Sequence, residues 1–119
     1  MGSGNDDKSL PPLAERRPKQ RKRVLLTGIV AYGEGAFSFD CTIRNLSETG
    51  ARIAVGTNTQ FPADLYLINV RDRIAYVAKV AWNKGAEAGV IFEKALPLSG
   101  ITDPKLTFLN RLWLAKAAR

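Results

Sequence analysis

Hydrophobic side chains recur at every second position over short stretches of this chain, which is the spacing of a β-strand with one buried face. The pattern is clearest in residues 37–44, whose alternating apolar side chains are Phe37, Phe39, Cys41 and Ile43. Further stretches rich in β-branched and aromatic residues are separated by glycine and polar residues; they cover residues 24–32, 51–55, 64–70, 74–83 and 88–93. The pattern therefore predicts six short strands.

The connections between these strands favour an antiparallel barrel. Gly33-Glu34-Gly35 is typical of a hairpin turn, and the later breaks at residues 56–59, 71–73 and 83–85 are also short. Closing such a sheet on itself removes its exposed edges. We expect a mostly β fold, with a six-stranded antiparallel barrel over residues 24–93.

Residues 103–118 change to the spacing of a helix. Asp103 suits the N-cap and Pro104 the first helical position. The apolar residues of this segment lie three and four apart, and they are Leu106, Leu109, Leu112 and Trp113, with Phe108 and Leu114 widening the face. We expect a C-terminal amphipathic helix that packs on the barrel or on a second subunit.

Size and composition indicate one domain with tails. At 119 residues the chain can bury a core without disulfides, and its single cysteine, Cys41, is expected in that core. The chain has no histidine, which argues against a conventional zinc or haem site, so no cofactor or metal is expected. No apolar run approaches the roughly 20 residues that span a bilayer, so we expect no membrane span and a cytoplasmic protein.

The net charge of +7 is concentrated near the N-terminus. Residues 1–14 are polar and predict a disordered tail, in which residues 1–4 look like a remnant of cloning. In residues 15–23, six of nine residues are basic and one is acidic, so this basic arm carries a charge of +5. A concentrated arm suits one compact anion at least as well as a nucleic-acid polymer. The scattered carboxylates and the lack of a nucleophile motif argue against an enzyme.

Two short motifs carry candidate binding chemistry. Arg17 and Arg21 lie four residues apart in the basic arm, and a guanidinium group presents a planar fork of donors that matches phosphate oxygens and the O6/N7 edge of guanine. Asn45 and Ser47 supply short donors and acceptors at a strand-to-strand corner, where Gly50 allows close approach. Together these residue types suit a small anionic guanine nucleotide.

The order and spacing of the two motifs resemble the PilZ domain family, whose members are bacterial receptors for cyclic di-GMP (c-di-GMP). Arg17 to Arg21 matches the family pattern RxxxR, residues 45–50 match [D/N]xSxxG, and residues 80–92 resemble the closing strand pair. The resemblance implies a stand-alone domain over residues 15–119. The ligand-binding residues that it implies are Arg16, Arg17, Arg21, Asn45, Ser47 and Gly50.

Two positions carry finer implications of the resemblance. In the family, an arginine at the position of Arg16 tends to accompany two intercalated c-di-GMP molecules, so such a ligand dimer is expected. The family more often has Asp where this chain has Asn45, and the amide removes a charge that could bind the N1–H and N2–H₂ groups of guanine.

The resemblance also implies a mechanism. The basic arm would be mobile without ligand and would fold over the Asn45–Gly50 corner when c-di-GMP bridges the two motifs, which would present a new surface to an effector protein in trans. Trp82 shares the parity of Ala78 and Val80 and is expected to be a packing anchor, with contact to a ligand at the barrel mouth as the alternative. Arg44 and Arg52 flank the corner and either add positive potential or are ordinary outward residues.

Two other functions stay open. One is a protein-interaction module of the same fold that works through its helix and barrel surface without ligand. The other is a small basic RNA- or DNA-binding barrel, which needs exposed aromatic residues on a strand face. Phe37 and Phe39 are expected to face the core instead, so this function is less favoured. The sequence does not indicate the partner, the downstream process or the oligomeric state.

Overall fold

The computed structural model describes residues 22–118. The predicted tail of residues 1–14 and the arm residues 15–21 lie outside the described residues. In chain order the elements are β1 (Lys22–Tyr32), β2 (Phe37–Leu46), β3 (Gly50–Ala54), β4 (Asp64–Asn69), β5 (Ile74–Lys84), β6 (Glu87–Pro97), the 3₁₀ turns η1 (Leu98–Gly100) and η2 (Pro104–Leu106), and the helix α1 (Thr107–Ala117).

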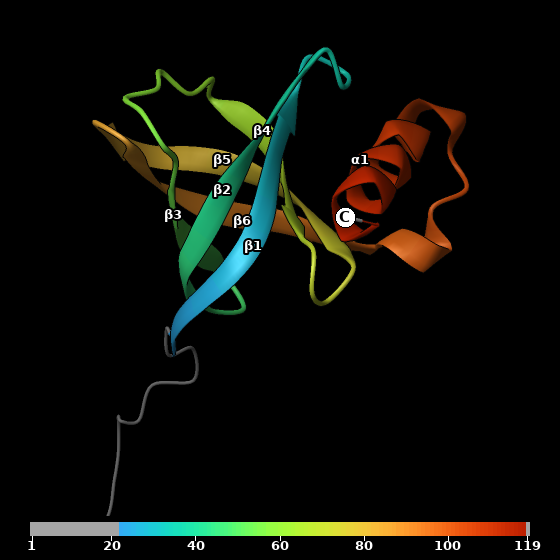
Figure 1. Ribbon diagram of the computed structural model, residues 1–119, viewed down its shortest axis with the longest axis horizontal. Coiled ribbons are helices and arrows are strands. Elements are labelled where there is room, and N and C mark those ends of the chain that lie inside the picture. Colours follow the sequence, from blue (N-terminus) through green and yellow to red (C-terminus); the bar gives the residue numbers. More distant parts are fainter. Residues whose placement is uncertain (1–21, 119) are drawn as a thin grey trace, which may run out of the picture.

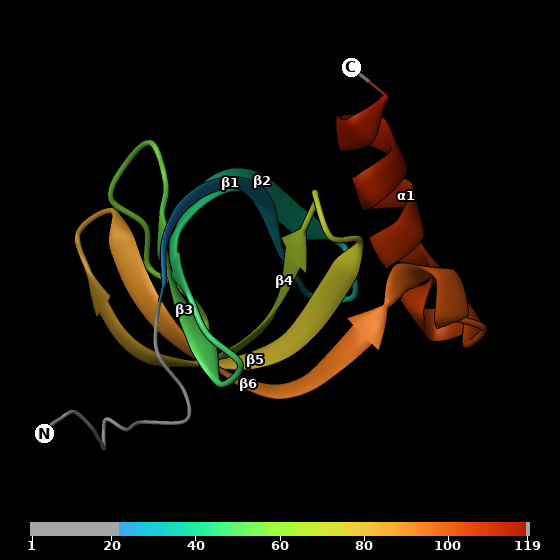
Figure 2. The same ribbon diagram turned by 90° about the horizontal axis from the view of Figure 1, so that it is seen from below.

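The six strands form a closed barrel in the order β1-β2-β3-β6-β5-β4, and every neighbouring pair is antiparallel (Figures 1 and 2). The barrel closes because β1 pairs with β2 along one edge and with β4 along the other. Figure 2 shows the strands as a ring, with α1 packed against the outside. The predicted mostly β fold with a C-terminal helix is therefore confirmed.

The inside of the barrel is filled by the alternating residues of its strands. Cys41 and Ile43 are buried there, as the alternation in residues 37–44 predicts. Phe39 lies at the edge of the same core and is half-buried, whereas the prediction for Phe37 is wrong, since its side chain is 57% exposed. Phe37 begins β2 at the hairpin, beyond the filled part of the barrel, and stacks on Tyr32 with the ring centroids 5.1 Å apart.

A second core lies between the outer wall of the barrel and α1. β6 runs to Pro97 and is longer than the expected residues 88–93. Leu96 in the added part packs against this second core, and Leu98, directly after the strand, is buried in it. The pairing with the whole of β5, from Lys84 with Glu87 to Ile74 with Pro97, sets the strand length where local propensity is weak. The buried members of the second core are Ile29, Ala31, Ile68, Ala75, Leu98, Phe108 and Leu109.

The C-terminal helix starts later than the sequence predicts. The carboxylate of Asp103 accepts a hydrogen bond from the backbone N–H of Lys105, and the chain forms the 3₁₀ turn η2 before α1 begins at Thr107. Leu109 is buried, but Leu114 is 60% exposed and does not widen the packed face. These two leucines are five positions apart in the sequence, which places them about 140° apart around the helix axis.

Trp113 fastens α1 to the β4–β5 turn. Its indole Nε1–H donates a 2.8 Å hydrogen bond to the carbonyl of Val70, and the guanidinium of Arg73 lies 4.6 Å from the ring centroid. The turn itself is held by the buried amide of Asn69, which accepts from the backbone N–H of Asp72 and donates to its carboxylate. Helix and turn therefore form one packed unit. In the part of the chain that the structure describes, no helix has the length and apolar character needed to cross a membrane.

Candidate functional site

The structure describes half of the predicted binding residues. Arg16, Arg17 and Arg21 lie outside the described residues. Asn45, Ser47 and Gly50 are described and follow one another from the end of β2, through the connecting turn, to the start of β3. The predicted corner is therefore shorter than residues 45–50, because Asn45 and Leu46 are still paired within the sheet.

Ser47 organises the turn between β2 and β3. Its hydroxyl oxygen accepts hydrogen bonds from the backbone N–H groups of Thr49 and Gly50, each at 3.2 Å. The backbone N–H of Ser47 in turn donates to the carbonyl of Gly50 at 2.9 Å. The side chain thus caps its own turn, as serine commonly does. The hydroxyl also donates a 3.3 Å hydrogen bond to the carbonyl of Gly50, so donation to a ligand acceptor would replace that bond.

Gly50 is needed for the packing of two strands. It is buried and pairs with Ile91 of β6, and a Cβ at this position would overlap with the carbonyl oxygen of Val90. Only glycine lets β3 approach β6 this closely. The same strand pair is extended by the hydrogen bond from the backbone N–H of Phe92 to the carbonyl of Thr49. The motif glycine therefore has a structural role in addition to the predicted role beside a ligand.

The strand register places Asn45 between two arginines. Asn45 is opposite Arg23 of β1 on one side and opposite Arg52 of β3 on the other. Arg52 is in turn opposite Gly89 of β6, which is opposite Trp82 of β5. We call these five residues the outer row. Strand neighbours of Arg23, Asn45, Arg52 and Gly89 belong to the barrel core or pack against it; these neighbours are Val24, Leu46, Ala51, Ile53, Ala88 and Val90.

Trp82 belongs to this outer row and not to the core, so its prediction as a packing anchor is wrong. Its side chain is 42% exposed, and its indole lies over Gly89, where a Cβ would overlap with Nε1. The register of β5 against β6 shifts between Val80 and Trp82. A β-bulge inserts one residue and so reverses the parity of everything beyond it.

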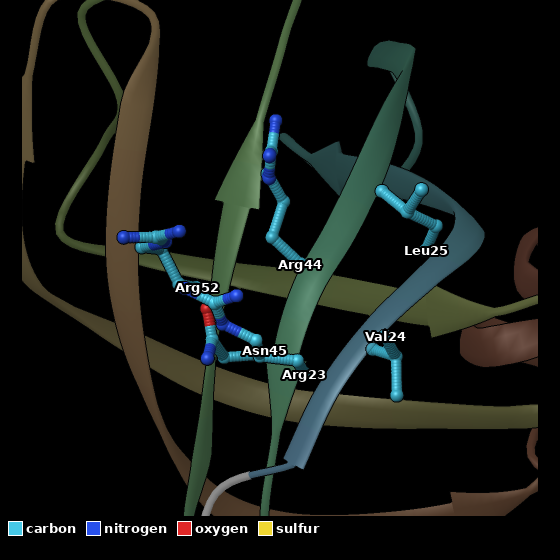
Figure 3. Close-up of a pocket in the computed structure, with 6 residues that line it drawn as sticks. All are labelled: Arg23, Val24, Leu25, Arg44, Asn45 and Arg52. Carbon is cyan, nitrogen blue, oxygen red and sulfur yellow. The ribbon is translucent and has the colours of Figure 1, made fainter.

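A hollow of about 470 Å³ lies on the outer wall at the end of the outer row (Figure 3), within the range of small-molecule sites. Figure 3 shows Arg23, Asn45 and Arg52 gathered together, while Arg44 points along the wall away from them. Arg44 is exposed and lies where the β2–β3 register shifts, between Ile43 and Asn45. The lining residues are Arg23, Val24, Leu25, Arg44, Asn45 and Arg52.

The hollow is strongly cationic. Three guanidinium groups line it, and the ion pairs formed between described residues involve other cations: Arg71, Lys79 and Lys116. The Nε atom of Arg52 is buried and has no acceptor within residues 22–118. Residues 22–118 also contain no group of three or more His, Cys, Asp or Glu side chains placed to hold a metal ion. Guanidinium groups, one amide and a nearby aromatic face suit an organic anion with flat, acceptor-rich bases.

Sequence reasoning missed one member of this site and gave a second only as an alternative. Arg23 was counted only as part of the charged arm, and Trp82 was favoured as a packing anchor, with contact to a ligand as the alternative. The hairpin turn gives an approximate register for β1 against β2, but a register shift between Arg23 and Leu26 decides that Arg23 meets Asn45. Such irregularities have no reliable sequence signature. The expectation that Arg52 flanks the corner is confirmed by its position opposite Asn45.

The family model of the PilZ domain matches residues 15–101, which is most of the chain. No curated protein matches the chain.

Proposed function

Because the chain belongs to the PilZ domain family, a family of c-di-GMP receptors, we propose that it binds c-di-GMP over the outer wall of its barrel, in the hollow beside Asn45. The observation that carries this proposal is the meeting of the Asn45–Ser47 motif with an arginine-lined hollow at the start of β1. PilZ domains act by binding, and their family is not an enzyme family.

The described residues offer complementary groups for such a ligand. c-di-GMP carries two phosphates and two guanine bases, and the arginines of the hollow supply positive potential for the phosphates. The amide of Asn45 and the hydroxyl of Ser47 supply hydrogen bonds to a guanine edge. Trp82, at the far end of the outer row, supplies an exposed aromatic face on which a base can stack.

The predicted arm residues complete the proposed site. Arg21 precedes Arg23 by two residues, so the extended chain limits their separation to about 7 Å. We propose that Arg17 and Arg21 contact guanine edges and phosphate, and that Arg16 supports binding of an intercalated ligand dimer. Ligand binding would then present arm and ligand together as a surface for an effector protein in trans. Cytoplasmic location remains a prediction.

Isothermal titration calorimetry tests the proposal directly. We expect c-di-GMP to bind with micromolar or tighter affinity, and Arg21→Ala to abolish binding, because charge-assisted bidentate contacts are lost. Arg111→Ala, an exposed arginine of α1, is the matched control and should bind as the wild type does. Two ligands per chain would support the role of Arg16, whereas one ligand would remove it.

The same titration separates the rival functions. No heat with c-di-GMP at high concentration would contradict the receptor proposal and favour a ligand-free interaction module. Heat with a short RNA alone, falling steeply with salt, would instead favour a polynucleotide binder. GTP serves as a control for simple attraction of any guanine nucleotide to the basic arm.

A further inference from the structure

Resting on the proposed function, we propose that Arg23 and Arg52 form a pair that binds a phosphate of the ligand, and that the amide at Asn45 keeps this pair available. Neither arginine belongs to the two sequence motifs. The pair lies on the barrel wall itself, so it offers a fixed binding element in addition to the arm.

The register places the two arginines symmetrically about Asn45. Arg23 of β1 and Arg52 of β3 are both direct cross-strand partners of Asn45. Neighbouring strands are about 4.8 Å apart, so the two arginine backbones are separated by roughly 10 Å. Two long side chains at that separation can both donate to one phosphate held between them, which leaves the Asn45 amide available to a guanine edge. Figure 3 shows the three side chains converging at this point of the hollow.

Arg52 has a donor that needs an acceptor. Its Nε atom is buried and makes no hydrogen bond within the part of the chain that the structure describes. A buried donor without an acceptor raises the free energy of the folded protein. A charged acceptor forms the strongest hydrogen bond with such a donor. A phosphate oxygen that reaches this side chain would supply the missing bond. On its other side Arg52 is opposite Gly89, over which the indole of Trp82 lies, so the outer row continues as an apolar aromatic surface.

The identity of residue 45 decides whether the pair is free to bind an anion. An aspartate between two guanidinium groups would form ion pairs with both and would neutralise part of their charge. Asparagine has nearly the same shape but no charge, so the pair keeps its full attraction for phosphate. Among described residues the ion-paired aspartates are elsewhere, at Asp40, Asp64 and Asp72.

Arg44 provides a matched control within the same hollow. It lines the cavity and carries the same charge, but it lies at the register shift of β2 and points away from Asn45. Removing it should lower the general positive potential without removing a phosphate contact. Arg44→Gln and Arg52→Gln therefore separate a specific pair from nonspecific attraction.

Calorimetric titrations with c-di-GMP at low and moderate salt test the pair. We expect Arg52→Gln to bind roughly tenfold to a hundredfold more weakly than the wild type, and Arg44→Gln to stay within about threefold. Asn45→Asp should bind c-di-GMP more weakly than Asn45→Ala does, because only the aspartate would form ion pairs with Arg23 and Arg52. That difference should shrink as salt screens the added charge. Thermal melts of each variant ensure that affinities are compared between folded proteins.

The opposite order of c-di-GMP affinities for the two residue-45 variants would overturn the inference. Tighter binding by Asn45→Asp than by Asn45→Ala would mean that a carboxylate at this position contacts the guanine edge and does not form ion pairs with the two arginines. Equal losses for Arg44→Gln and Arg52→Gln, or no loss for Arg52→Gln, would also overturn it while leaving the receptor proposal intact. Failure of the wild type to bind c-di-GMP would overturn the proposed function itself, and this inference with it.

Discussion

Replacing Trp113 by phenylalanine should weaken the attachment of α1 to the barrel. The indole Nε1–H donates a 2.8 Å hydrogen bond to the carbonyl of Val70, and phenylalanine has no donor at this position. The face of the ring also carries the guanidinium of Arg73 at 4.6 Å, and a phenyl ring holds a cation less strongly than an indole. Both losses fall on the contact between the helix and the β4–β5 turn.

The size of the effect follows from these two contacts. A lost hydrogen bond between partly buried groups costs about 0.5–1.5 kcal/mol of unfolding free energy, and the weaker cation–π contact adds a few tenths. We therefore expect Trp113→Phe to lower the unfolding free energy by about 1–2 kcal/mol. For a domain of this size, 1 kcal/mol corresponds to a change in Tm of roughly 4–8 °C.

Calorimetric melting of two tryptophan variants provides the assay. Trp82→Phe makes the same chemical change at a side chain that is 42% exposed and makes no hydrogen bond to the described residues. It should melt within about 2 °C of the wild type, whereas Trp113→Phe should melt at least about 4 °C lower. Equal melting of the two variants, or a larger loss for Trp82→Phe, would refute the assignment of Trp113 as the anchor of the helix.

Three further predictions concern the barrel and the β4–β5 turn. Gly50→Ala should cost about 1–3 kcal/mol in urea unfolding, because the added Cβ overlaps with the carbonyl of Val90; an unchanged midpoint would contradict the close approach of β3 and β6. Burial, aided by the nearby Asp40 charge, raises the pKa of the Cys41 thiol to about 12, so a thiol reagent at pH 8 should label it only on unfolding, and rapid native labelling would disprove this. The hydrogen bond from Arg71 lowers the pKa of the Asp72 carboxyl, so its contribution to stability is present above about pH 4 and is lost on further acidification. Tm of Asp72→Asn should therefore fall less steeply below pH 4 than Tm of the wild type. Parallel pH profiles for the two proteins would contradict this role of the Asp72 carboxylate.

The barrel could be predicted because its inner face obeys a period of two. Cys41 and Ile43 are buried as the alternation requires, and the turn residues mark where strands end. The pattern failed at Phe37 because alternation alone does not say how far the filled interior extends along a strand. It failed at Leu114 because only the inner side of α1 meets the barrel.

The candidate site was less predictable because it depends on the register between strands. Asn45 and Ser47 could be found from a local motif, but their neighbours belong to other strands. Register shifts beside Arg23 and before Trp82 change which residues stand opposite each other. The packing role of Gly50 was hidden for the same reason, since it depends on the backbone of β6.

The outer row has a consequence for how this surface can change. Backbone pairing of five strands fixes the positions from Arg23 to Trp82, whatever side chains they carry. The side chains at positions 23, 45, 52 and 82 belong to neither core, so we expect their exchange to leave the interior intact. Gly89 is the exception, because the indole occupies the place of its side chain. The barrel wall is thus a template on which ligand preference can evolve, or be redesigned, at four positions independently of folding.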